Sequence, residues 1–299
     1  MPPSRRRIDG VLLLDKPQGI TSNAALMRVK RLYRAEKAGH TGTLDPLASG
    51  LLPICFGSAT RFAQFLLDAP KRYIATVRLG ATTTTQDAEG EIVAARSVDC
   101  ARGDVEGALE RFTGRQLQTP PAYSALKFEG RPLYEYARRG IDIPRAPREV
   151  VIHALRLLQW QPPDATIDVE CSKGTYVRAL AADLGEALGC GAHLAALRRT
   201  ASGGFEVRDA LTFEALEAMD EAALDAFLRP VAVLVAHLPA LTVTGDAARR
   251  FRHGGAVPAG THRNGLVAAY EAQVLLGIAE VADGIASPRR TIAQALARP

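Results

Sequence analysis

One stretch of the chain, residues 38–57 (AGHTGTLDPLASGLLPICFG), constrains the fold more than any other. It contains four glycines and two prolines, but a single carboxylate, Asp45, and a single imidazole, His40. Glycine permits backbone conformations that other residues avoid, proline fixes φ, and the leucines of the stretch favour burial. We therefore expect a shaped, rigid loop that holds Asp45 away from bulk water. A buried acid is costly unless a cation or hydrogen bonds compensate its charge, so a partner is expected elsewhere in the sequence.

The same residues also resemble the start of a helix. Asp45 would then be the N-cap residue, Pro46 the first helical residue, and Gly50 would follow the end of a short turn. Asp-Pro pairs are common at the start of turns, so the stretch alone does not separate the two interpretations. The rest of the chain has to decide between them.

The length of the chain, 299 residues, indicates two domains, because a usual single domain has roughly 100–200 residues. A candidate boundary lies between Arg229-Pro230 and the turn at Pro239, after which short segments are separated by glycines. This pattern predicts a large domain over residues 1–238 and a small β-rich domain over residues 239–299. No segment approaches the roughly 18 apolar residues that a membrane span needs, so we expect no membrane association.

The charge of the chain permits a polyanionic partner without proving one. There are 37 Lys and Arg residues against 32 Asp and Glu residues, a net charge of +5. Basic residues gather on both sides of the central stretch, at Arg28, Lys30, Arg31, Arg34 and Lys37 before it and at Lys71, Arg72 and Arg78 after it. A basic helix face is also what an ordinary solvated surface looks like.

Cysteine and glycine patterns indicate neither a metal nor a nucleotide cofactor. The four cysteines are widely spaced, no histidine pair has metal-ligand spacing, and no GxGxxG or GxxxxGK[ST] motif is present. We therefore expect no metal, no cofactor and free thiols in a reducing cytoplasm.

Two further segments supply candidate partners for Asp45. Residues 72–80 alternate as a strand whose apolar face includes Tyr73, a core residue or a flat wall for a base. Arg178 lies in the first turn of an apolar-striped helix, where the helix dipole disfavours a cation by about 0.3–1 kcal/mol. Arg178 is therefore either a surface residue or the partner of a fixed carboxylate.

Several segments in order resemble one family, the TruB family of bacterial tRNA pseudouridine-55 synthases. They cover about residues 10–200 and are DKPQGITSN, AGHTGTLDPLASGLLPICFG, KRYIATVRLG, TPPAYSALKFEGRPLYEYAR, CSKGTYVRALAADLG and GCGAHLAALRRT. The C-terminal segment is similar to the PUA-like RNA-binding domain of this family in position, length and its Pro288-Arg289-Arg290 ending. The expected architecture is α+β, a large mixed and mainly antiparallel sheet flanked by helices, plus the small C-terminal β-rich module.

The resemblance implies an isomerase that flips a uridine out of the tRNA T-loop, detaches the uracil and rejoins it through carbon 5. It implies no cofactor or metal, the T-arm stem-loop as partner, and we expect a cytoplasmic monomer. The catalytic residues that it implies are Asp45, Arg178 and Tyr73. The implied substrate-binding residues are His40, Tyr73, Tyr176, Leu197, Lys16 and Pro17. In the Thr-rich turn this chain has Thr84 where relatives usually have Asp, while Asp87 keeps the second acidic position.

On this interpretation, Asp45, a carboxylate whose reference pKa is about 3.9, is held ionised by Arg178. The basic residues around the central stretch would contact the RNA backbone. Two other functions are weighed against the isomerase: a non-catalytic tRNA-binding or folding protein on the same fold, and a hydrolytic glycosidase. Asp45, Tyr73 and Arg178 together argue against the first, and the lack of a second acid near the loop argues against the second.

Overall fold

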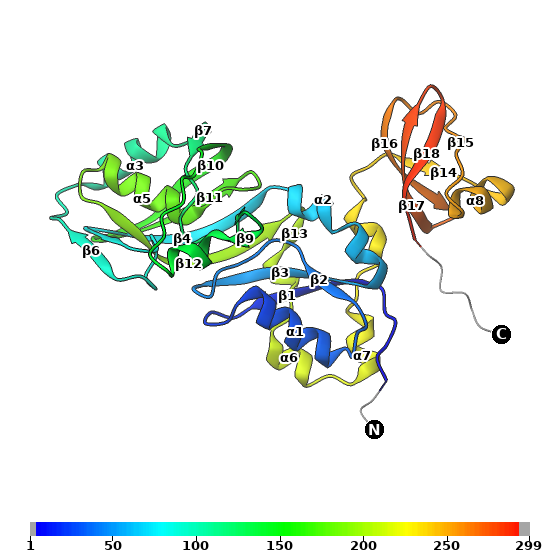
Figure 1. Cartoon of the computed structure of the whole chain (residues 1–299), viewed down its shortest axis with the longest axis horizontal. Coiled ribbons are helices and arrows are strands. Elements are labelled where there is room, and N and C mark those ends of the chain that lie inside the picture. The colour runs from blue at the N-terminus through cyan, green and yellow to red at the C-terminus, as the bar shows by residue number, and fades with distance from the viewer. Residues whose placement is uncertain (1–3, 293–299) are drawn as a thin grey trace.

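Residues 4–292 are described here from a computed structural model. The chain forms a large lobe around a nine-stranded sheet and a smaller lobe around a five-stranded sheet. Figure 1 shows the smaller lobe, drawn in orange and red, set apart at one end of the molecule. No helix within residues 4–292 has the length and apolar character needed to cross a membrane.

The strands of the large sheet are β1 (Gly10–Lys16), β2 (Ala38–His40), β3 (Ala48–Phe56), β4 (Lys71–Leu79), β7 (Gly114–Gln118), β10 (Arg148–Gln161), β11 (Asp164–Cys171), β12 (Ala192–Ser202) and β13 (Phe205–Glu206). Two short hairpins accompany it: β5 (Ala81–Thr83) with β6 (Ile92–Ala95), and β8 (Lys127–Phe128) with β9 (Arg131–Pro132).

The helices of the large lobe are α1 (Ser22–Leu32), α2 (Ala63–Asp68), α3 (Arg102–Arg111), α4 (Leu133–Ala137), α5 (Val177–Ala187), α6 (Phe213–Glu217) and α7 (Glu221–Ala226), with 3-10 turns η1 (Gly57–Arg61), η2 (Val207–Asp209) and η3 (Val231–Leu234). The small lobe contains β14 (Ala240–Thr242), α8 (Gly245–Arg252), β15 (Val257–Pro258), β16 (Gly265–Glu271), β17 (Val274–Ala282) and β18 (Ile285–Thr291).

The strand order of the large sheet is β1-β3-β12-β4-β11-β10-β7, with β2 paired to β3 and β13 to β12. Only the β3–β12 pair is parallel among the pairs of this sheet within the described chain. The prediction of a mixed, mainly antiparallel sheet with a C-terminal β-rich module is therefore confirmed. The predicted alternation of residues 72–80 is also present, because β4 buries every second side chain.

A glycine permits the close approach of β3 and β12. Gly50 lies opposite Arg199 in the parallel pair and has a φ of +101°. A Cβ atom at this position would lie 2.3 Å from the carbonyl oxygen of Arg199, so any larger residue would separate the strands. This contact brings the central loop next to β12.

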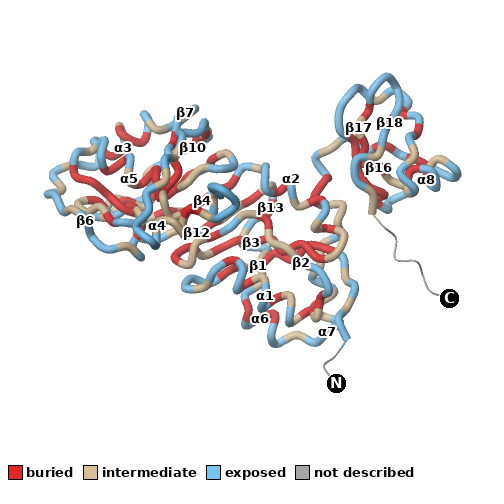
Figure 2. The backbone as a smooth tube through the Cα atoms, in the orientation of Figure 1, coloured by how far each residue is buried: buried red, intermediate tan, exposed pale blue. Residues whose placement is uncertain are grey.

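Two apolar cores hold the large sheet. One core packs helices such as α1 and α5 against one face and contains Leu12, Val29, Ile54, Ala75 and Leu180. The other lies on the opposite face and extends into the small lobe. It joins Leu234 and Val235, at the end of the large lobe, to Ala268 and Ile278 of the small lobe. In Figure 2 the buried residues follow the strands of both sheets. The two lobes therefore share apolar contacts as well as a chain connection.

An acid stabilises the start of helix α3. The helix begins at Arg102 and its N-cap is Ala101. Asp104 lies in the first turn and accepts a hydrogen bond from the backbone N–H of Ala101, at 2.7 Å. An acid in the first turn of a helix satisfies the same backbone donors and the helix dipole.

Candidate active site

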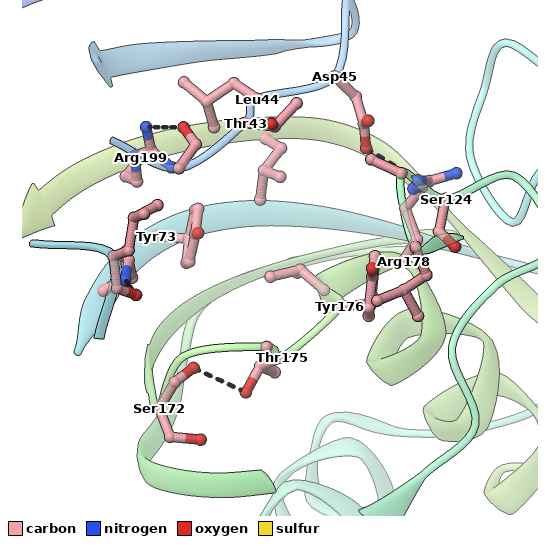
Figure 3. A pocket seen from close by; sticks show the side chains of 18 residues that line it. Thr43, Leu44, Asp45, Tyr73, Ser124, Ser172, Thr175, Tyr176, Arg178 and Arg199 are labelled. Atoms are coloured by element: carbon pink, nitrogen blue, oxygen red, sulfur yellow. Dashed lines mark hydrogen bonds and ion pairs between the residues drawn. The ribbon is translucent and has the colours of Figure 1, made fainter. Parts of the chain in front are cut away.

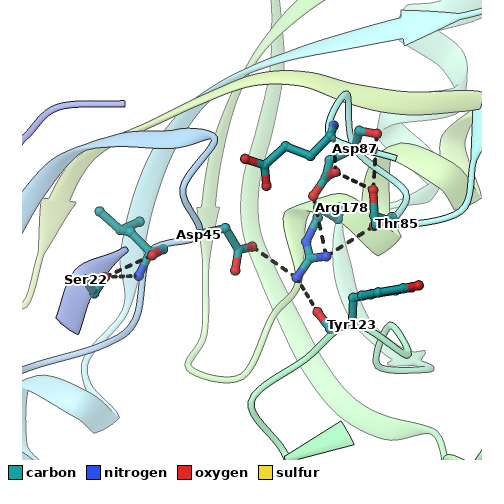
Figure 4. A network of polar contacts seen from close by, with 8 residues as sticks. Ser22, Asp45, Thr85, Asp87, Tyr123 and Arg178 are labelled. Carbon is teal, nitrogen blue, oxygen red and sulfur yellow. Dashed lines mark hydrogen bonds and ion pairs between the residues drawn. The ribbon is translucent and has the colours of Figure 1, made fainter. Parts of the chain in front are cut away.

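The central loop is a short connection between β2 and β3, which pair antiparallel. The buried hydroxyl of Ser22 on α1 fixes its tip, because it accepts from the Leu44 N–H at 2.7 Å and donates to the Leu44 carbonyl at 2.9 Å. The N–H of Gly19 donates to the Pro46 carbonyl at 2.8 Å. Leu44 itself is buried in the core. Asp45 is thus presented from a backbone held on both sides (Figure 4).

The interpretation of Asp45 as a helix N-cap is wrong. The Ala48 N–H donates to the Asp45 carbonyl at 3.1 Å, which closes a single turn, and β3 begins at Ala48. Pro46 occupies the second position of that turn, where its fixed φ is favoured. The carboxylate is therefore free to face the pocket instead of a helix end.

Arg178 links Asp45 to a second acid. One guanidinium nitrogen lies 3.0 Å from Asp45 Oδ2 and the other lies 3.5 Å from Asp87 Oδ2. The same two nitrogens donate to the carbonyls of Tyr123 at 2.8 Å and Thr85 at 3.2 Å. The Arg178 side chain is only 6% exposed. Figure 4 shows the guanidinium between the two acids, with Asp45 and Asp87 on different sides of it.

Asp87 is the more deeply buried of the two acids. Its side chain is 3% exposed, whereas that of Asp45 is 41% exposed. It accepts hydrogen bonds from the Thr85 hydroxyl and from the Glu89 N–H, the latter at 3.1 Å. Arg178 is thus anchored from behind by Asp87, and Asp45 keeps one side open to the pocket.

Thr84, in the Thr-rich turn, makes two hydrogen bonds with the Glu91 backbone. Its hydroxyl accepts from the Glu91 N–H at 3.2 Å, and its own N–H donates to the Glu91 carbonyl at 3.0 Å. These bonds close the turn between β5 and β6. The residue therefore stabilises the segment that carries Asp87.

The pKa of Asp45 is raised above the ordinary value. Burial is the main cause and the charge of Asp87 adds to it, whereas the charges of Arg178 and Lys16 oppose it. Arg178 thus lowers the pKa of Asp45, the direction that favours the ionised carboxylate, while burial acts against it. Partial burial changes this pKa more than the charge of Arg178 does.

Asp45 opens into a cavity of about 340 Å³ on one face of the large sheet. Five of the residues singled out from the sequence line it: Asp45, Tyr73, Tyr176, Arg178 and Leu197. They come from the loop, β4, the residue before α5, α5 itself and β12. Figure 3 shows Asp45 and Arg178 in contact. Tyr73, on β4, and Tyr176, just before α5, lie further along the cavity.

Tyr176 is fixed through its backbone. The buried amide of Gln118, at the end of β7, accepts from the Tyr176 N–H at 2.8 Å and donates to its carbonyl at 3.1 Å. Because Arg178 follows two residues later, this clamp also sets the start of α5. Burial raises the pKa of Tyr176, and the charge of Arg178 opposes that change.

Lys16, Pro17 and His40 lie outside the lining of this cavity. Lys16 is completely buried and donates to the carbonyls of Pro17 at 2.9 Å and Ile20 at 2.7 Å. Burial lowers its pKa to about 8, and the charge of Asp45 opposes this change. Pro17 is exposed, and His40 is half-buried. The Nδ1 atom of His40 is buried and has no hydrogen-bond partner within the described chain.

The basic residues before and after the loop are mostly engaged within the protein. Arg28 pairs with Glu217 at 2.6 Å and Arg34 with Glu221, while Arg72 pairs with Asp168 and Arg78 with Asp164. Lys71 is buried and donates to three carbonyls at the end of α2. Arg28 on α1 therefore contacts α6, and Arg34, just after α1, contacts α7.

The chain matches one family in three consecutive parts. Residues 30–177 match the profile described as TruB family pseudouridylate synthase (N terminal domain). Residues 178–236 match the tRNA pseudouridylate synthase B C-terminal domain, and residues 239–292 match Pseudouridine synthase II TruB, C-terminal.

Two curated relatives share more than half of their residues with this chain, and both are called tRNA pseudouridine synthase B. The protein from Thiobacillus denitrificans is 56% identical over 294 residues, which cover 98% of this chain and 99% of the relative. The protein from Burkholderia lata is 54% identical over 297 residues, which cover 97% of this chain and 92% of the relative.

Two solved structures are similar to this chain in fold and sequence. A Cbf5-Nop10-Gar1 complex contains a chain with a TM-score of 0.71 and 30% identity, covering 91% of this chain and 78% of the other. An H/ACA RNP bound to a substrate RNA containing 2'-deoxyuridine contains a chain with a TM-score of 0.70 and 27% identity. The match covers 95% of this chain and 84% of the other. The chain belongs to the TruB family of pseudouridylate synthases.

Proposed function

We propose that this protein isomerises uridine to pseudouridine at position 55 in the T-loop of tRNA. The family assignment and the names of the relatives support the reaction and the tRNA substrate. The observation that carries the proposal is the Asp45–Arg178 pair, 3.0 Å apart, at the wall of a cavity suited to one flipped base. A folded loop must release that base from its stack before it reaches the carboxylate.

In the proposed reaction the bond between ribose C1' and uracil N1 breaks, and the electron pair leaves with the uracil ring. Asp45 starts this step by attacking C1' or by removing a ribose proton, and the ionised carboxylate serves either route. The ring then turns and C5 bonds to C1', while the Asp45–C1' bond breaks or, in the other route, Asp45 returns its proton to the ribose. The proton on C5 is then lost while N1 gains one. No atom is added or removed overall, so no water enters the product.

The surroundings of Asp45 support isomerisation over hydrolysis. Among the described residues that line the cavity, Asp45 is the only carboxylate, whereas hydrolytic glycosidases use two. Asp87 lies behind Arg178 and is buried, so it does not face the substrate side. Leu44, Leu67 and Leu197 contribute apolar walls that exclude water once a base fills the cavity.

We assign Tyr73 and Tyr176 to contact with the flipped base, because both line the cavity and aromatic stacking on a base contributes about 1–3 kcal/mol. Leu197 forms part of the same wall. His40 contacts RNA outside the cavity, and Lys16 with Pro17 supports the loop from behind. Lys16 lies opposite Gly50 in the β1–β3 pair, at the strand end next to the loop.

The remaining assignments concern the whole chain. Residues 1–238 form the catalytic domain and residues 239–299 a PUA-like RNA-binding domain, of which residues 293–299 lie outside the described part. The enzyme acts as a cytoplasmic monomer on the T-arm stem-loop and needs no cofactor. The profile match over residues 239–292 and the free cysteines of the described chain support this organisation.

The decisive experiment is to incubate the protein with unmodified tRNA and to map pseudouridine by nucleotide. We expect modification at position 55 of the T-loop and nowhere else. Binding without pseudouridine would favour the non-catalytic RNA-binding alternative. Release of free uracil would favour a hydrolase.

The rate of a single turnover is expected to fall at low pH, because protonated Asp45 cannot act as a base or nucleophile. Since the folded protein raises this pKa, the midpoint should lie above the ordinary Asp value of about 3.9. Replacing Asp87 by Asn removes a charge that raises the pKa, so the midpoint should move to lower pH. Single-turnover rates on a T-arm hairpin, measured from about pH 4 to about pH 8, test both expectations. A midpoint that does not move in Asp87→Asn would contradict the assignment of this titration to Asp45.

RNA binding by the small domain is expected to depend on α8. This helix ends in a basic segment in which Arg249 and Arg250 are both exposed. Replacing both by Ala should weaken tRNA binding and lower the slope of log affinity against log salt by about one for each lost phosphate contact. Truncation is a poorer test, because the shared core would become exposed. Arg102→Ala, on α3 of the large lobe, is the matched control, and an unchanged slope in the α8 variant would exclude this surface.

A further inference from the structure

Arg199 is the largest side chain that is fully buried in the described chain, with 1% exposure. It lies on β12, and its guanidinium donates to the carbonyls of Leu51 at 2.7 Å and Gly42 at 3.0 Å. Leu51 belongs to β3 and Gly42 to the loop that presents Asp45. One side chain therefore holds both the strand and the loop that precedes it.

The charge of Arg199 is held by backbone carbonyls, as are those of the buried Lys16 and Lys71. The neighbouring residue Arg198 pairs with Asp15 at 2.6 Å, and Arg178 pairs with Asp45 and Asp87. The hydrogen-bond acceptors of Arg199 in the described chain are instead neutral carbonyl oxygens. A buried cation held by carbonyls is costly, so it is expected to persist only where it has a function.

Arg199 also contacts the wall opposite Asp45. It pairs in register with Tyr73 of β4, and both residues line the cavity. Figure 3 shows Arg199 between the loop residues Thr43 and Leu44 and the strand that carries Tyr73. Burial raises the pKa of the Tyr73 phenol, and the charge of Arg199 opposes that change. Residues directly opposite in an antiparallel pair project from the same face, so the Arg199 and Tyr73 side chains lie side by side.

The backbone around Arg199 leaves little room for adjustment. Gly50 on β3 lies against its backbone, and a Cβ atom at Gly42 would lie 3.4 Å from its guanidinium. Gly42, in the loop, and Gly50, in β3, both have positive φ values, a conformation that favours glycine. The loop therefore packs in ordinary van der Waals contact with the arginine side chain.

We propose that Arg199 is a positioning residue that couples the Asp45 loop to Tyr73 and keeps the carboxylate and the phenol at one fixed spacing across the flipped base. This inference rests on the proposed isomerase function. Asp45 reacts at the ribose while Tyr73 faces the base, so a change in their spacing slows the reaction without removing either group. A misplacement of about 1 Å is enough to cost about 100-fold in rate.

The test is a double-mutant cycle on the full-length protein with unmodified tRNA. Single-turnover rate constants, reaction amplitudes and tRNA dissociation constants are measured for wild type, Arg199→Met, Tyr73→Phe and the double variant. Arg198→Met is the matched control, because Arg198 is adjacent in sequence but half-exposed and paired to Asp15. Arg199→Gln replaces Arg199→Met in the cycle if the latter does not fold.

We expect Arg199→Met to lower the rate constant about 100-fold, with amplitude and tRNA affinity within about threefold of wild type. Tyr73→Phe should cost much less in the Arg199→Met background than in wild type, because the two residues act as one unit. Arg198→Met should leave the rate within about threefold.

Three results would overturn the inference. A merely structural role would lower the amplitude, through a misfolded fraction, and leave the rate constant unchanged. Equal effects of Tyr73→Phe in both backgrounds, or a small effect in wild type, would show that the two residues are not coupled. If the wild-type protein forms no pseudouridine, the proposed function itself fails. This outcome differs from an active enzyme in which Arg199 and Tyr73 act independently.

Discussion

Asp45→Asn is expected to abolish pseudouridine formation while tRNA binding stays within about threefold of wild type. The loss should reach about four orders of magnitude or more, as for the removal of a nucleophile from other enzymes. The amide has nearly the shape of the acid, and Ser22 and Gly19 hold the loop through its backbone. The geometry of the cavity should therefore survive the substitution.

The stability of the same variant separates catalysis from folding. Because burial raises the pKa of Asp45, the folded protein disfavours its ionised form, and removing the charge should leave the free energy of unfolding unchanged or higher. Asp164→Asn is the control, since Asp164 pairs with Arg78 on the surface and this pair lowers its pKa. Single-turnover assays and urea unfolding measure both properties. Substantial turnover by Asp45→Asn would exclude the proposed mechanism.

Regular patterns made much of the fold predictable from sequence. The alternation of residues 72–80 indicated β4, and the apolar stripe around Leu180 and Leu184 indicated α5. The partner for Asp45 was also predictable in part. A buried acid needs a cation, and Arg178 stood where the helix dipole disfavours it. Both arguments need only local sequence and a simple electrostatic rule.

The supporting residues of the site could not be predicted in this way. Thr21 caps α1, whereas Ser22 binds the backbone of Leu44. Gln118 and Arg199 likewise bind backbone groups of distant segments. A backbone group carries no residue identity, so no sequence pattern marks such pairs. Asp87 could be noticed from the sequence only by its position in the Thr-rich turn. That it is buried behind Arg178 could be seen only in the structure.

Arg178→Met is expected to reduce both stability and activity, because it removes the cation between two acids. Asp87 would remain buried without its ionic partner, which should cost about 3–5 kcal/mol in the free energy of unfolding. The hydrogen bonds from Arg178 to the carbonyls of Thr85 and Tyr123 would also be lost. Activity should fall at least about 100-fold, because Asp45 would lose its partner and its direction. The exposed Arg78→Met is the control and should cost at most about 1 kcal/mol.

A second substitution separates the two effects of Arg178. Adding Asp87→Asn to Arg178→Met removes the uncompensated buried charge, so most of the lost stability should return. Activity should not return, because Asp45 still lacks its cation. Arg178→Lys should retain more stability than Arg178→Met but remain slow, because one ammonium group does not span both acids and both carbonyls as the guanidinium does. Recovery of turnover in the Arg178→Met/Asp87→Asn protein would show that Arg178 serves only to neutralise Asp87, and not to hold Asp45.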